Sequence, residues 1–378
     1  MNNRTTVLVL VAMLAIALLL GACARVSQEQ ERQSPSAVAG ATAAATSAAI
    51  WYELRFTTPR YPDDPAIHRG GLDARLVQLM DQATKTMDVA DYDFDLANVA
   101  DAMARAKQRG VIVRMVTDSD TLNDAKNKQI QAAFDTLRKA NIPIVDDQRQ
   151  EIMHNKFTVV DGEWVETGSW NYTDGDTYRL NNNLVILRSP ELARNYTDEF
   201  DKMFVKRQFG PKKDKGVPFP SLRIEGVKVE NYFAPEDDVA NRIIATLQQS
   251  STSIHFMAFS FTHDGIGQTV RDKARAGVKV TGVFETTGSN TSYSEYTRMK
   301  QEGLDVYQDG NPYAMHHKVF VVDGRLTILG SFNFSENADR GNDENLLIVD
   351  DPTFAKAFED EFGRVLEQAK NPPERKKR

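Results

Sequence analysis

The decapeptide MHNKFTVVDG occupies residues 153–162, and a near copy, MHHKVFVVDG, returns at residues 315–324. Both copies carry a His and a Lys two positions apart and end in an Asp-Gly pair that follows apolar residues. An Asp-Gly pair beside such residues predicts a β-hairpin with a two-residue turn. A chain that writes this hairpin twice is expected to contain two copies of the same structural unit.

The turn position sets which residues face each other across each predicted hairpin. With Asp161 and Gly162 as the turn, and the matching pair in the second copy, side chains two apart project to one face. The pairs that this register predicts are His154 with Ser169, Lys156 with Thr167, and His316 with Ser331. In the second copy His316 shares a face with Lys318, and His317 points to the other face.

Longer stretches around the hairpins repeat as well. Residues 84–118 align with residues 251–285 as a strand, a helix ending at Gly110 or Gly277, and a Val-rich strand. Each unit continues with a helix, a short strand, the decapeptide hairpin and a closing helix. The expected ranges are 126–140 and 292–302 for the helices, 142–145 and 304–307 for the strands, and 190–204 and 352–368 for the closing helices. Alternating strands and helices predict an α/β fold with largely buried sheets.

The first fifty residues read as an export segment. An apolar run from Val7 to Leu20 is short for a bilayer span and precedes Leu-Gly-Ala-Cys, which resembles a bacterial lipobox. We expect a signal peptide over 1–22, lipidation of Cys23 and a flexible Ala/Ser/Gln-rich tether over 23–50. This makes the protein an exported, membrane-anchored lipoprotein of the bacterial cell envelope; a plain secretory signal or an uncleaved anchor is the alternative.

The remaining chain divides around a Pro/Gly/Lys-rich stretch. We place a first repeat at 51–207, a linker at 208–221, a second repeat at 222–370 and a basic tail at 371–378. The formal net charge of −7 gives no support to nucleic-acid binding, because such proteins more often carry a basic field. The basic run Lys212-Lys213-Asp214-Lys215 is interpreted as solvated linker rather than as a binding patch.

Cys23 is the only cysteine, so the exported chain has no disulfide and no thiolate nucleophile. The recurring candidate side chains are instead imidazoles, ammonium groups, hydroxyls and carboxamides: His154, Lys156, Ser169 and Asn171, with His316, Lys318, Ser331 and Asn333. Burying a Lys beside a His costs free energy unless an anion arrives. Lys and Asn suit the oxygens of a phosphate diester, while one His attacks and the other protonates the leaving oxygen. No metal or other cofactor is expected, because Lys is a poor partner for a metal site.

Both copies also resemble the HKD motif of the phospholipase D superfamily. The pattern His-x-Lys-x4-Asp-x6-Gly-Ser-x-Asn runs from His154 to Asn171 and from His316 to Asn333. The resemblance covers residues 51 to 370 and is nearest in size to compact bacterial endonucleases and the mitochondrial cardiolipin hydrolase type. It implies two α/β lobes related by a pseudo-twofold axis, each a mostly buried mixed sheet flanked by helices, with the site at their interface. It also implies a monomer with an internal pseudo-dimer, and a covalent phosphohistidine on His154 with His316 as the acid.

Further residues follow from the comparison of the copies. Glu344 corresponds to Asn182, so one imidazole is expected to meet a carboxylate and the other an amide, unless Glu344 only caps its loop. Asp161 and Asp323 belong to the motif and are counted as candidates, although an Asp-Gly turn alone explains them. The aromatic residues between Ser and Asn, Trp170 and Phe332, are expected to pack in the core.

Two functions fit this reading, and a third is disfavoured. The first is a phosphodiesterase of the phospholipase D type that hydrolyses the head-group bond of glycerophospholipids near the membrane. The second is an envelope-associated, metal-independent endonuclease that uses the same residues on DNA or RNA. A non-catalytic binding module is disfavoured because both motifs are intact.

Overall fold

The computed structural model describes residues 51–374. The expected signal peptide, Cys23 and the tether up to residue 50 lie outside the described residues, as do residues 375–378 of the basic tail. No helix in the described range combines the length and the apolar character that crossing a bilayer requires.

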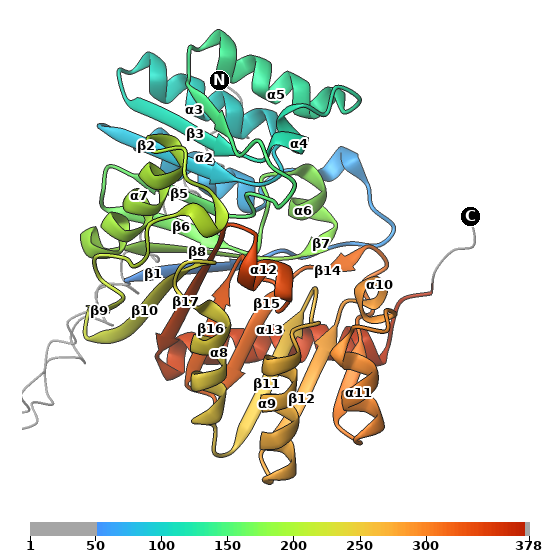
Figure 1. The fold of residues 1–378 in the computed structure, drawn as a ribbon. Helices are drawn as coiled ribbons and strands as arrows, with labels where there is room; N and C mark the ends of the chain where they lie inside the picture. The colour runs from blue at the N-terminus through green and yellow to red at the C-terminus, as the bar shows by residue number, and fades with distance from the viewer. Residues whose placement is uncertain (1–50, 375–378) are drawn as a thin grey trace, which may run out of the picture. The chain divides into compact units, whose positions relative to one another are not determined.

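Two mixed β-sheets repeat one strand order (Figure 1). From edge to edge, the first sheet contains β4 (Ile144–Asp146), β3 (Ile112–Thr117), β2 (Thr86–Asp91), β5 (Lys156–Val160), β6 (Trp164–Gly168), β8 (Asn183–Arg188) and β1 (Tyr52–Phe56). In the same order, the second sheet contains β13 (Asp305–Gln308), β12 (Lys279–Phe284), β11 (Ser253–Ala258), β15 (Lys318–Val322), β16 (Leu326–Gly330), β17 (Glu344–Asp350), β10 (Val227–Ala234) and, in addition, β9 (Ser221–Ile224). We call each sheet with its helices a lobe. The predicted α/β class with two related lobes is confirmed.

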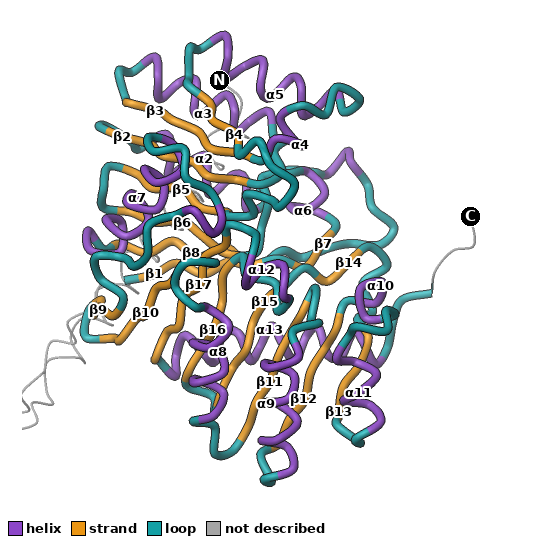
Figure 2. Tube along the Cα trace, in the orientation of Figure 1, coloured by secondary structure: helices purple, strands orange, loops and turns teal. Residues whose placement is uncertain are grey.

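Helices cover both faces of each sheet, which explains the continuous apolar runs in the central strands (Figure 2). One core cluster lies under α2 (Leu72–Asp81), α3 (Ala97–Gln108) and α5 (Lys128–Lys139) of the first lobe. Another lies under α8 (Val239–Gln248), α9 (Asp264–Arg275) and α11 (Glu295–Gln301) of the second. A third cluster contains side chains of both lobes, including those of the closing helices α7 (Pro190–Phe204) and α13 (Pro352–Lys370). The two lobes therefore share one core.

Local sequence fixes where the closing helices begin. Ser189 accepts a hydrogen bond from the Leu192 N–H at the start of α7, and Asp351 accepts one from the Phe354 N–H at the start of α13. A proline follows each cap, at a position where its missing N–H costs nothing. Both helices start at the residue that the sequence predicted.

Short helices and strands lie in the connections between the main elements of each lobe. They are α4 (Ser119–Leu122), α6 (Asp174–Tyr178), β7 (Leu180–Asn181), α10 (Thr286–Ser289), α12 (Glu336–Arg340), β14 (Ala314–Met315) and the 3-10 turns η1 (Pro65–Ile67) and η2 (Gly210–Lys212). The limits that we placed on the two repeats and the linker stay a prediction.

The predicted register of the hairpins is wrong by one residue. β5 pairs with β6 so that Val160 lies opposite Trp164 rather than Glu163. Glu163 is an extra residue in the turn, and its N–H donates to the Val160 carbonyl oxygen at 3.0 Å. The predicted pair of Lys156 with Thr167 therefore does not form, and the second hairpin is shifted in the same way.

Asp161 and Asp323 were counted among the candidate site residues, and the structure places them elsewhere. Each occupies the first turn position with a left-handed φ, of 56° and 54°. The Asp161 carboxylate accepts backbone N–H groups of residues 84–86, and Asp323 does the same for residues 251–253. Partial burial opposes ionisation, but these bonds outweigh it and lower the pKa of both carboxyls. Both residues therefore brace the start of the central strands β2 and β11.

Replacing Asp323 with Ala is expected to destabilise the protein by about 1–2 kcal/mol at neutral pH, because the strand-entry N–H groups lose their acceptor. The carboxyl pKa is lowered by folding, so its stabilisation is present above the unfolded pKa of about 4 and is lost as the pH falls through the folded value. Urea unfolding of both proteins from neutral to acidic pH should show the difference shrinking on acidification. A difference that grows on acidification would contradict this role.

Lys213 lies in the basic run that we interpreted as solvated linker, and that interpretation is wrong for this residue. It is only 4% exposed, and its Nζ lies 2.5 Å from Glu199, 3.0 Å from Glu236 and 2.9 Å from Asp343. Burial opposes the charge, but the three carboxylates outweigh it and raise the pKa of Lys213. The linker therefore inserts a cation among carboxylates of both lobes.

Replacing Lys213 with Met is expected to cost about 3–5 kcal/mol of unfolding free energy, because it removes the cation that three buried carboxylates share and leaves them only Lys202 and Arg149. Denaturant unfolding measures the change, and the exposed neighbour provides the control: Lys212→Met should change the free energy of unfolding by under about 0.5 kcal/mol. Equal effects of the two substitutions would show that the buried charge cluster contributes nothing specific.

Candidate active site

Each candidate histidine is placed by the backbone of the opposite lobe. β7 of the first lobe and β14 of the second form a two-stranded parallel sheet, and the His316 N–H donates to the Asn181 carbonyl oxygen at 2.9 Å. Met153 forms an equivalent bridge to Asp343, and the His154 N–H donates to the Asp343 carbonyl oxygen at 3.0 Å. The two histidines therefore lie where the lobes cross.

The His154 imidazole is held by side chains of the second lobe. Its Nδ1 lies 2.8 Å from a carboxylate oxygen of Glu344, and the Ser331 hydroxyl contacts the same oxygen at 2.6 Å. All three side chains are buried. Glu344 therefore orients an imidazole, as the comparison of the copies suggested, and its partner is His154.

The His316 imidazole is held by side chains of the first lobe. Its Nδ1 lies 2.9 Å from the Asn182 Oδ1 and 3.3 Å from an Asp176 oxygen, and the Ser169 hydroxyl donates to the same Oδ1 at 2.8 Å. The Asn182 Nδ2 donates to two oxygens of Asp176, which fixes the orientation of the amide. His316 consequently carries its proton on Nδ1, which leaves Nε2 as the free nitrogen.

The predicted face-to-face pairs of His with Ser are replaced by a crossed arrangement. Ser169 and His154 belong to the same hairpin but serve different imidazoles, because both lie outside the paired ladder of β5 and β6. Gly168 redirects the chain here, with a φ of 154° and the Asn183 carbonyl oxygen only 2.3 Å from where a Cβ would lie. The same turn occurs at Gly330.

Asp176 is the site residue that sequence reasoning missed. The histidines are offset by 162 residues, since 316 minus 154 is 162, so Asp176 corresponds to Ala338 and Asn182 to Glu344. Each copy thus supplies one carboxylate, but from different positions. The expectation that the second imidazole would meet only an amide is corrected, because Asp176 lies beside Asn182. A comparison of the copies at this offset could have found the difference.

Lys156 and Lys318 direct buried ammonium groups into the same region. Each Nζ donates to the carbonyl oxygen of the histidine two residues earlier, at 2.7 and 2.8 Å. Within residues 51–374 neither ammonium group makes a second hydrogen bond. Lys156 lies over the ring of Tyr92 and Lys318 over the ring of Phe259, with 5.1 and 4.8 Å to the ring centroids. Both ammonium groups therefore keep donors for an anion.

The remaining motif residues divide between the site and the core. Asn171 donates to Asp176 at 3.2 Å, and the Oδ1 atoms of Asn171 and Asn333 are buried with no partner among the described residues. Trp170 and Phe332 are each 1% exposed. Trp170 belongs to the core cluster under α2, α3 and α5, and Phe332 belongs to the cluster under α8, α9 and α11. Their predicted place in the core is confirmed.

His317 points away from its neighbour, as the strand period predicted. Its Nε2 lies 3.0 Å from Glu361 of α13, and its Nδ1 lies 2.9 Å from the Asn183 amide. This buried histidine is therefore part of the structural packing between the lobes.

Electrostatics tie the two histidines to one centre. Burial lowers the pKa of His154 well below its usual value, and Lys156 and Lys318, one from each lobe, lower it further. The pKa of His316 is lowered by burial and by the same two lysines. Burial raises the pKa of Glu344 to about 8, whereas hydrogen bonds and His316 outweigh burial at Asp176 and lower its pKa to about 2. The two carboxylates therefore differ in how firmly they stay ionised.

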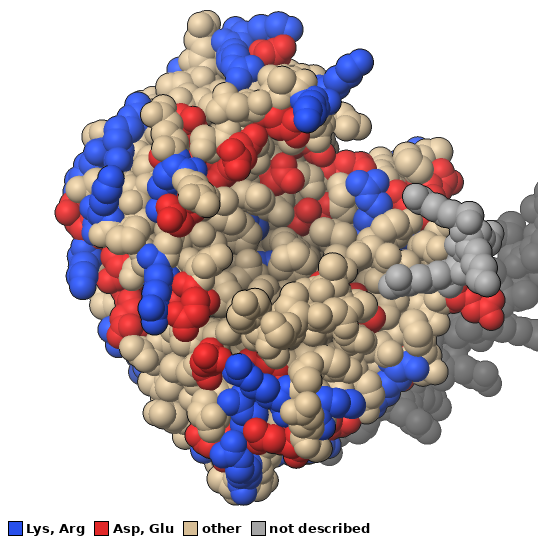
Figure 3. Space-filling view, turned by 45° about the vertical axis from the view of Figure 1, so that its right-hand side comes forward, with Lys and Arg blue, Asp and Glu red and all other residues tan. Residues whose placement is uncertain are grey.

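The surroundings of the two lysines differ in charge. Asp161 accepts the Thr84 N–H and Asp323 accepts the Ser251 N–H, so residues 84 and 251 occupy equivalent positions in the two copies. At this offset of 167 residues (251 minus 84), DYDFD at 91–95 of the first copy aligns with AFSFT at 258–262 of the second, which has no acidic residue. Burial and then the charges of Asp118, Asp93, Asp120 and Asp147 raise the pKa of Tyr92, whose ring lies 5.1 Å from that of His154, to about 12. Figure 3 shows acidic side chains gathered beside a hollow in the surface. The first-lobe side of the site is therefore acidic.

No cluster of three or more His, Cys, Asp or Glu side chains arranged to hold a metal ion occurs in the described range 51–374. The groups that converge are two imidazoles, two ammonium groups and two carboxamides, with carboxylates behind the imidazoles. Such a set can bind the oxygens of one phosphate group and place a nucleophile and a proton donor beside it.

Comparisons with known proteins agree with this geometry. Residues 76–204 and 243–366 each match the family model described as "Cardiolipin synthase, PLD-like domain". A mitochondrial cardiolipin hydrolase of Chlamydomonas reinhardtii is 25% identical over 44% of this chain and 85% of its own length. A phospholipase D of Rickettsia typhi is 28% identical over 34% of this chain, and the match spans 64% of that protein. The crystal structure of a phosphatidylserine synthase of Haemophilus influenzae superposes with a TM-score of 0.62 over 84% of this chain and 86% of its own, at 16% identity. That likeness concerns the fold alone.

The lowered pKa values predict that the imidazoles of His154 and His316 stay neutral, with the proton on Nδ1, at pH values where a free histidine, with a pKa of about 6.5, is already charged. Nitrogen-15 NMR of the imidazoles, assigned with single His→Asn variants, measures both the tautomer and the titration. His68 serves as the control within the same protein, because its carboxylate partners raise its pKa despite burial and it should titrate at a higher pH than the two site histidines. If His154 and His316 titrate at or above the usual histidine pKa, the electrostatic description of the site is wrong.

Proposed function

The chain belongs to the phospholipase D-like family, and from this premise we propose that it hydrolyses the head-group phosphodiester of glycerophospholipids through a covalent phosphohistidine. The observation that carries the proposal is the crossed support of the two histidines, in which each lobe orients the imidazole of the other. Lipidation of Cys23 and the tether would hold the enzyme at the membrane of the cell envelope, close to its substrate.

The first chemical step uses both imidazoles. The Nε2 of His154 attacks phosphorus, the bond from phosphorus to the head-group oxygen breaks, and His316 gives a proton to that oxygen. Lys156, Lys318 and the amides of Asn171 and Asn333 stabilise the charge on the non-bridging oxygens. In the second step His316 takes a proton from water, the water oxygen attacks phosphorus, and the bond to His154 breaks to release phosphatidate.

The two carboxylates support this division of roles. Burial raises the pKa of Glu344, so that it does little to favour an imidazolium and leaves His154 neutral for attack. Asp176 stays ionised beside His316, which favours a positive charge on that ring. The pKa of His316 is lowered while the lysines have no anion, and a bound phosphodiester brings the negative charge that offsets them.

The acidic first-lobe side supports a lipid rather than a nucleic acid as substrate. Asp93 and Asp118 lie close to Tyr92 and have pKa values raised to about 6, mainly by burial and then by neighbouring carboxylates. A polyanion that continues past the cleaved bond would add negative charge to this surface, whereas a phospholipid with one phosphodiester and a cationic head group would not. An envelope-associated endonuclease acting with the same residues is the second candidate.

The substrate choice is tested with the purified protein, a metal chelator, and four substrates offered separately: phosphatidylcholine, phosphatidylethanolamine, cardiolipin and single-stranded DNA. Release of phosphatidate is expected in the presence of the chelator, together with phosphatidylglycerol when the substrate is cardiolipin. Cleavage of DNA without lipid hydrolysis would overturn the lipid assignment in favour of the endonuclease. Loss of all activity in chelator alone would refute the metal-independent mechanism.

Substitution of either site histidine, His154→Asn or His316→Asn, is expected to reduce turnover by at least about a thousandfold. The first removes the nucleophile that accepts the phosphoryl group, and the second removes the group that gives and takes the proton. The matched control is His255→Asn, a partly exposed histidine that pairs with Glu359 on α13 and should keep activity within about twofold. Acid-quenched wild-type enzyme should carry substrate phosphate on His154 and not on His316. Equal labelling of both histidines would contradict the division of roles.

A further inference from the structure

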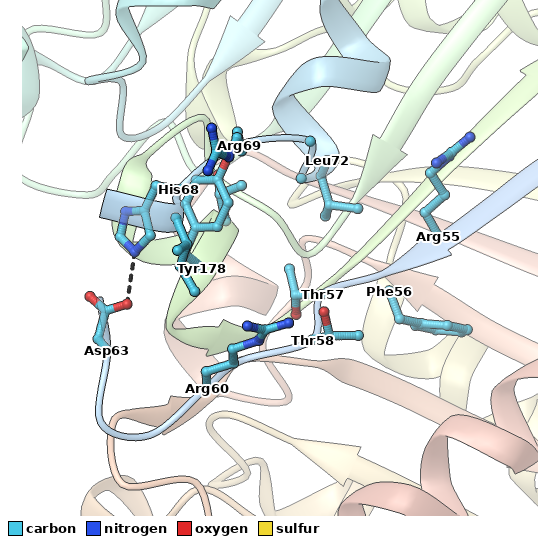
Figure 4. Close-up of a pocket in the computed structure, with 14 residues that line it drawn as sticks. Arg55, Phe56, Thr57, Thr58, Arg60, Asp63, His68, Arg69, Leu72 and Tyr178 are labelled. Carbon is cyan, nitrogen blue, oxygen red and sulfur yellow. Dashed lines mark hydrogen bonds and ion pairs between the residues drawn. The ribbon is translucent and has the colours of Figure 1, made fainter. Parts of the chain in front are cut away.

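The segment between β1 and α2, residues 57–71, encloses a cavity that the catalytic groups do not use. Its volume is about 390 Å³, within the range of small-molecule sites. Three arginines from this stretch and from the end of β1 line it: Arg55, Arg60 and Arg69. Figure 4 shows Thr57 and Thr58 among these side chains; the Thr57 hydroxyl already donates to the Leu180 carbonyl oxygen at 2.6 Å.

The positive charge of this cavity is only partly compensated. Arg55 pairs with Glu53 at 2.5 Å, whereas the exposed side chains of Arg60 and Arg69 form no ion pair or hydrogen bond with another described residue. The cavity also contains Asp63, but this carboxylate is already engaged by His68 at 2.7 Å and by Arg179 at 3.4 Å. Two guanidinium groups therefore face a cavity without an anion to pair with.

The start of α2 adds backbone donors to the same wall. Gly71 is the N-cap of this ten-residue helix and makes no side-chain cap, so the first N–H groups of the helix lack that acceptor. A side chain at position 71 is excluded, because its Cβ would lie 2.5 Å from a Thr177 methyl carbon. The helix end supports the arginines here but would not define a site without them.

His68 forms the rigid side of the cavity. Its two ring nitrogens lie 2.8 Å from Asp174 and 2.7 Å from Asp63, and its ring stacks on Tyr178 at 4.2 Å between centroids. These partners hold the 57–71 segment against α6. The cavity is therefore preformed rather than dependent on a ligand for its shape.

The cavity combines cationic and apolar walls. Ile67, which is 39% exposed, lines it together with Phe56 and Leu72. Guanidinium groups beside the Thr58 hydroxyl suit a phosphate oxygen, and the apolar side chains suit the glycerol or acyl part attached to it. From this combination we propose that the cavity binds the phosphate group of an anionic phospholipid, at a second site separate from the phosphodiester centre.

The second site has a direct structural path to His316. Thr57 exchanges hydrogen bonds with Asn182, accepting its N–H at 2.7 Å and donating its own N–H to the Asn182 carbonyl oxygen at 3.0 Å. Thr177 and Tyr178 line the cavity and directly follow Asp176 in α6. Asn182 and Asp176 are the two side chains at His316 Nδ1. A phosphate bound in the cavity thus stiffens the residues that position the proposed acid.

Calorimetric titration of the full chain with inorganic phosphate tests the site. Two phosphates are expected to bind, one at the catalytic centre and one in the cavity, and the double substitution Arg60→Gln/Arg69→Gln should weaken the second by at least about tenfold. The charge-matched control is Arg194→Gln/Lys279→Gln, two exposed cations away from both sites. Identical isotherms for the Arg60→Gln/Arg69→Gln variant and the wild type would overturn the proposal.

A second ligand identifies the source of the phosphate. Short-chain phosphatidate should bind the cavity more tightly than inorganic phosphate, and Ile67→Ser should remove that advantage without changing the affinity for inorganic phosphate. Equal affinity of the two ligands would restrict the site to a free phosphate and overturn its assignment to a lipid.

An activity assay with a soluble aryl phosphodiester separates the test of the second site from the test of the proposed function. The Arg60→Gln/Arg69→Gln variant should retain kcat/KM within about twofold on that small substrate, since neither arginine contacts the catalytic groups. Absence of turnover in the wild type would count against the proposed function and leave the binding result to be judged by itself.

Discussion

The hydrogen bond from His154 of one lobe to Glu344 of the other, with its counterpart from His316 to Asn182 and Asp176, is the constraint on which the site depends. An imidazole can act as nucleophile or acid only when its Nδ1 is held, because that contact fixes the tautomer and aims Nε2. Neither lobe provides this contact for its own histidine. A complete site therefore requires that the two lobes stay in one register, to within a fraction of an ångström.

Much of the remaining architecture can be understood as meeting that requirement. The strand pairs β7 with β14 and Met153 with Asp343 join the lobes immediately before each histidine. A core cluster shared by α7 and α13 gives the interface an apolar interior, and Lys213 pairs with carboxylates of both lobes at its edge. Asp343 takes part in both arrangements, since its carboxylate contacts Lys213 and its carbonyl oxygen accepts the His154 N–H. Removing the cation would thus disturb the site as well as the fold.

Sequence reasoning predicted the α/β fold, the duplication and the chemical groups of the site, because those follow from residue periods and from one repeated decapeptide. It failed where a single extra residue or a long-range partner decides the outcome. Glu163 enters the turn and shifts the ladder, so the pairs expected across each hairpin do not form. Asp176 and Lys213 look like surface residues in the sequence, yet both are buried, and each has a partner far along the chain, His316 for Asp176 and Asp343 for Lys213. The comparison of the copies used the difference at position 344 and passed over the one at position 176, where Asp176 stands against Ala338 at the same offset.

The central claim is that imidazoles from both lobes act on one phosphorus atom, and a crystal structure with vanadate bound at the centre tests it most directly. The account predicts one oxyanion with its metal atom between the Nε2 atoms of His154 and His316, and with both Lys156 and Lys318 in contact with its oxygens. An oxyanion that contacts the histidine and lysine of one lobe only, with the other histidine out of reach, would contradict it.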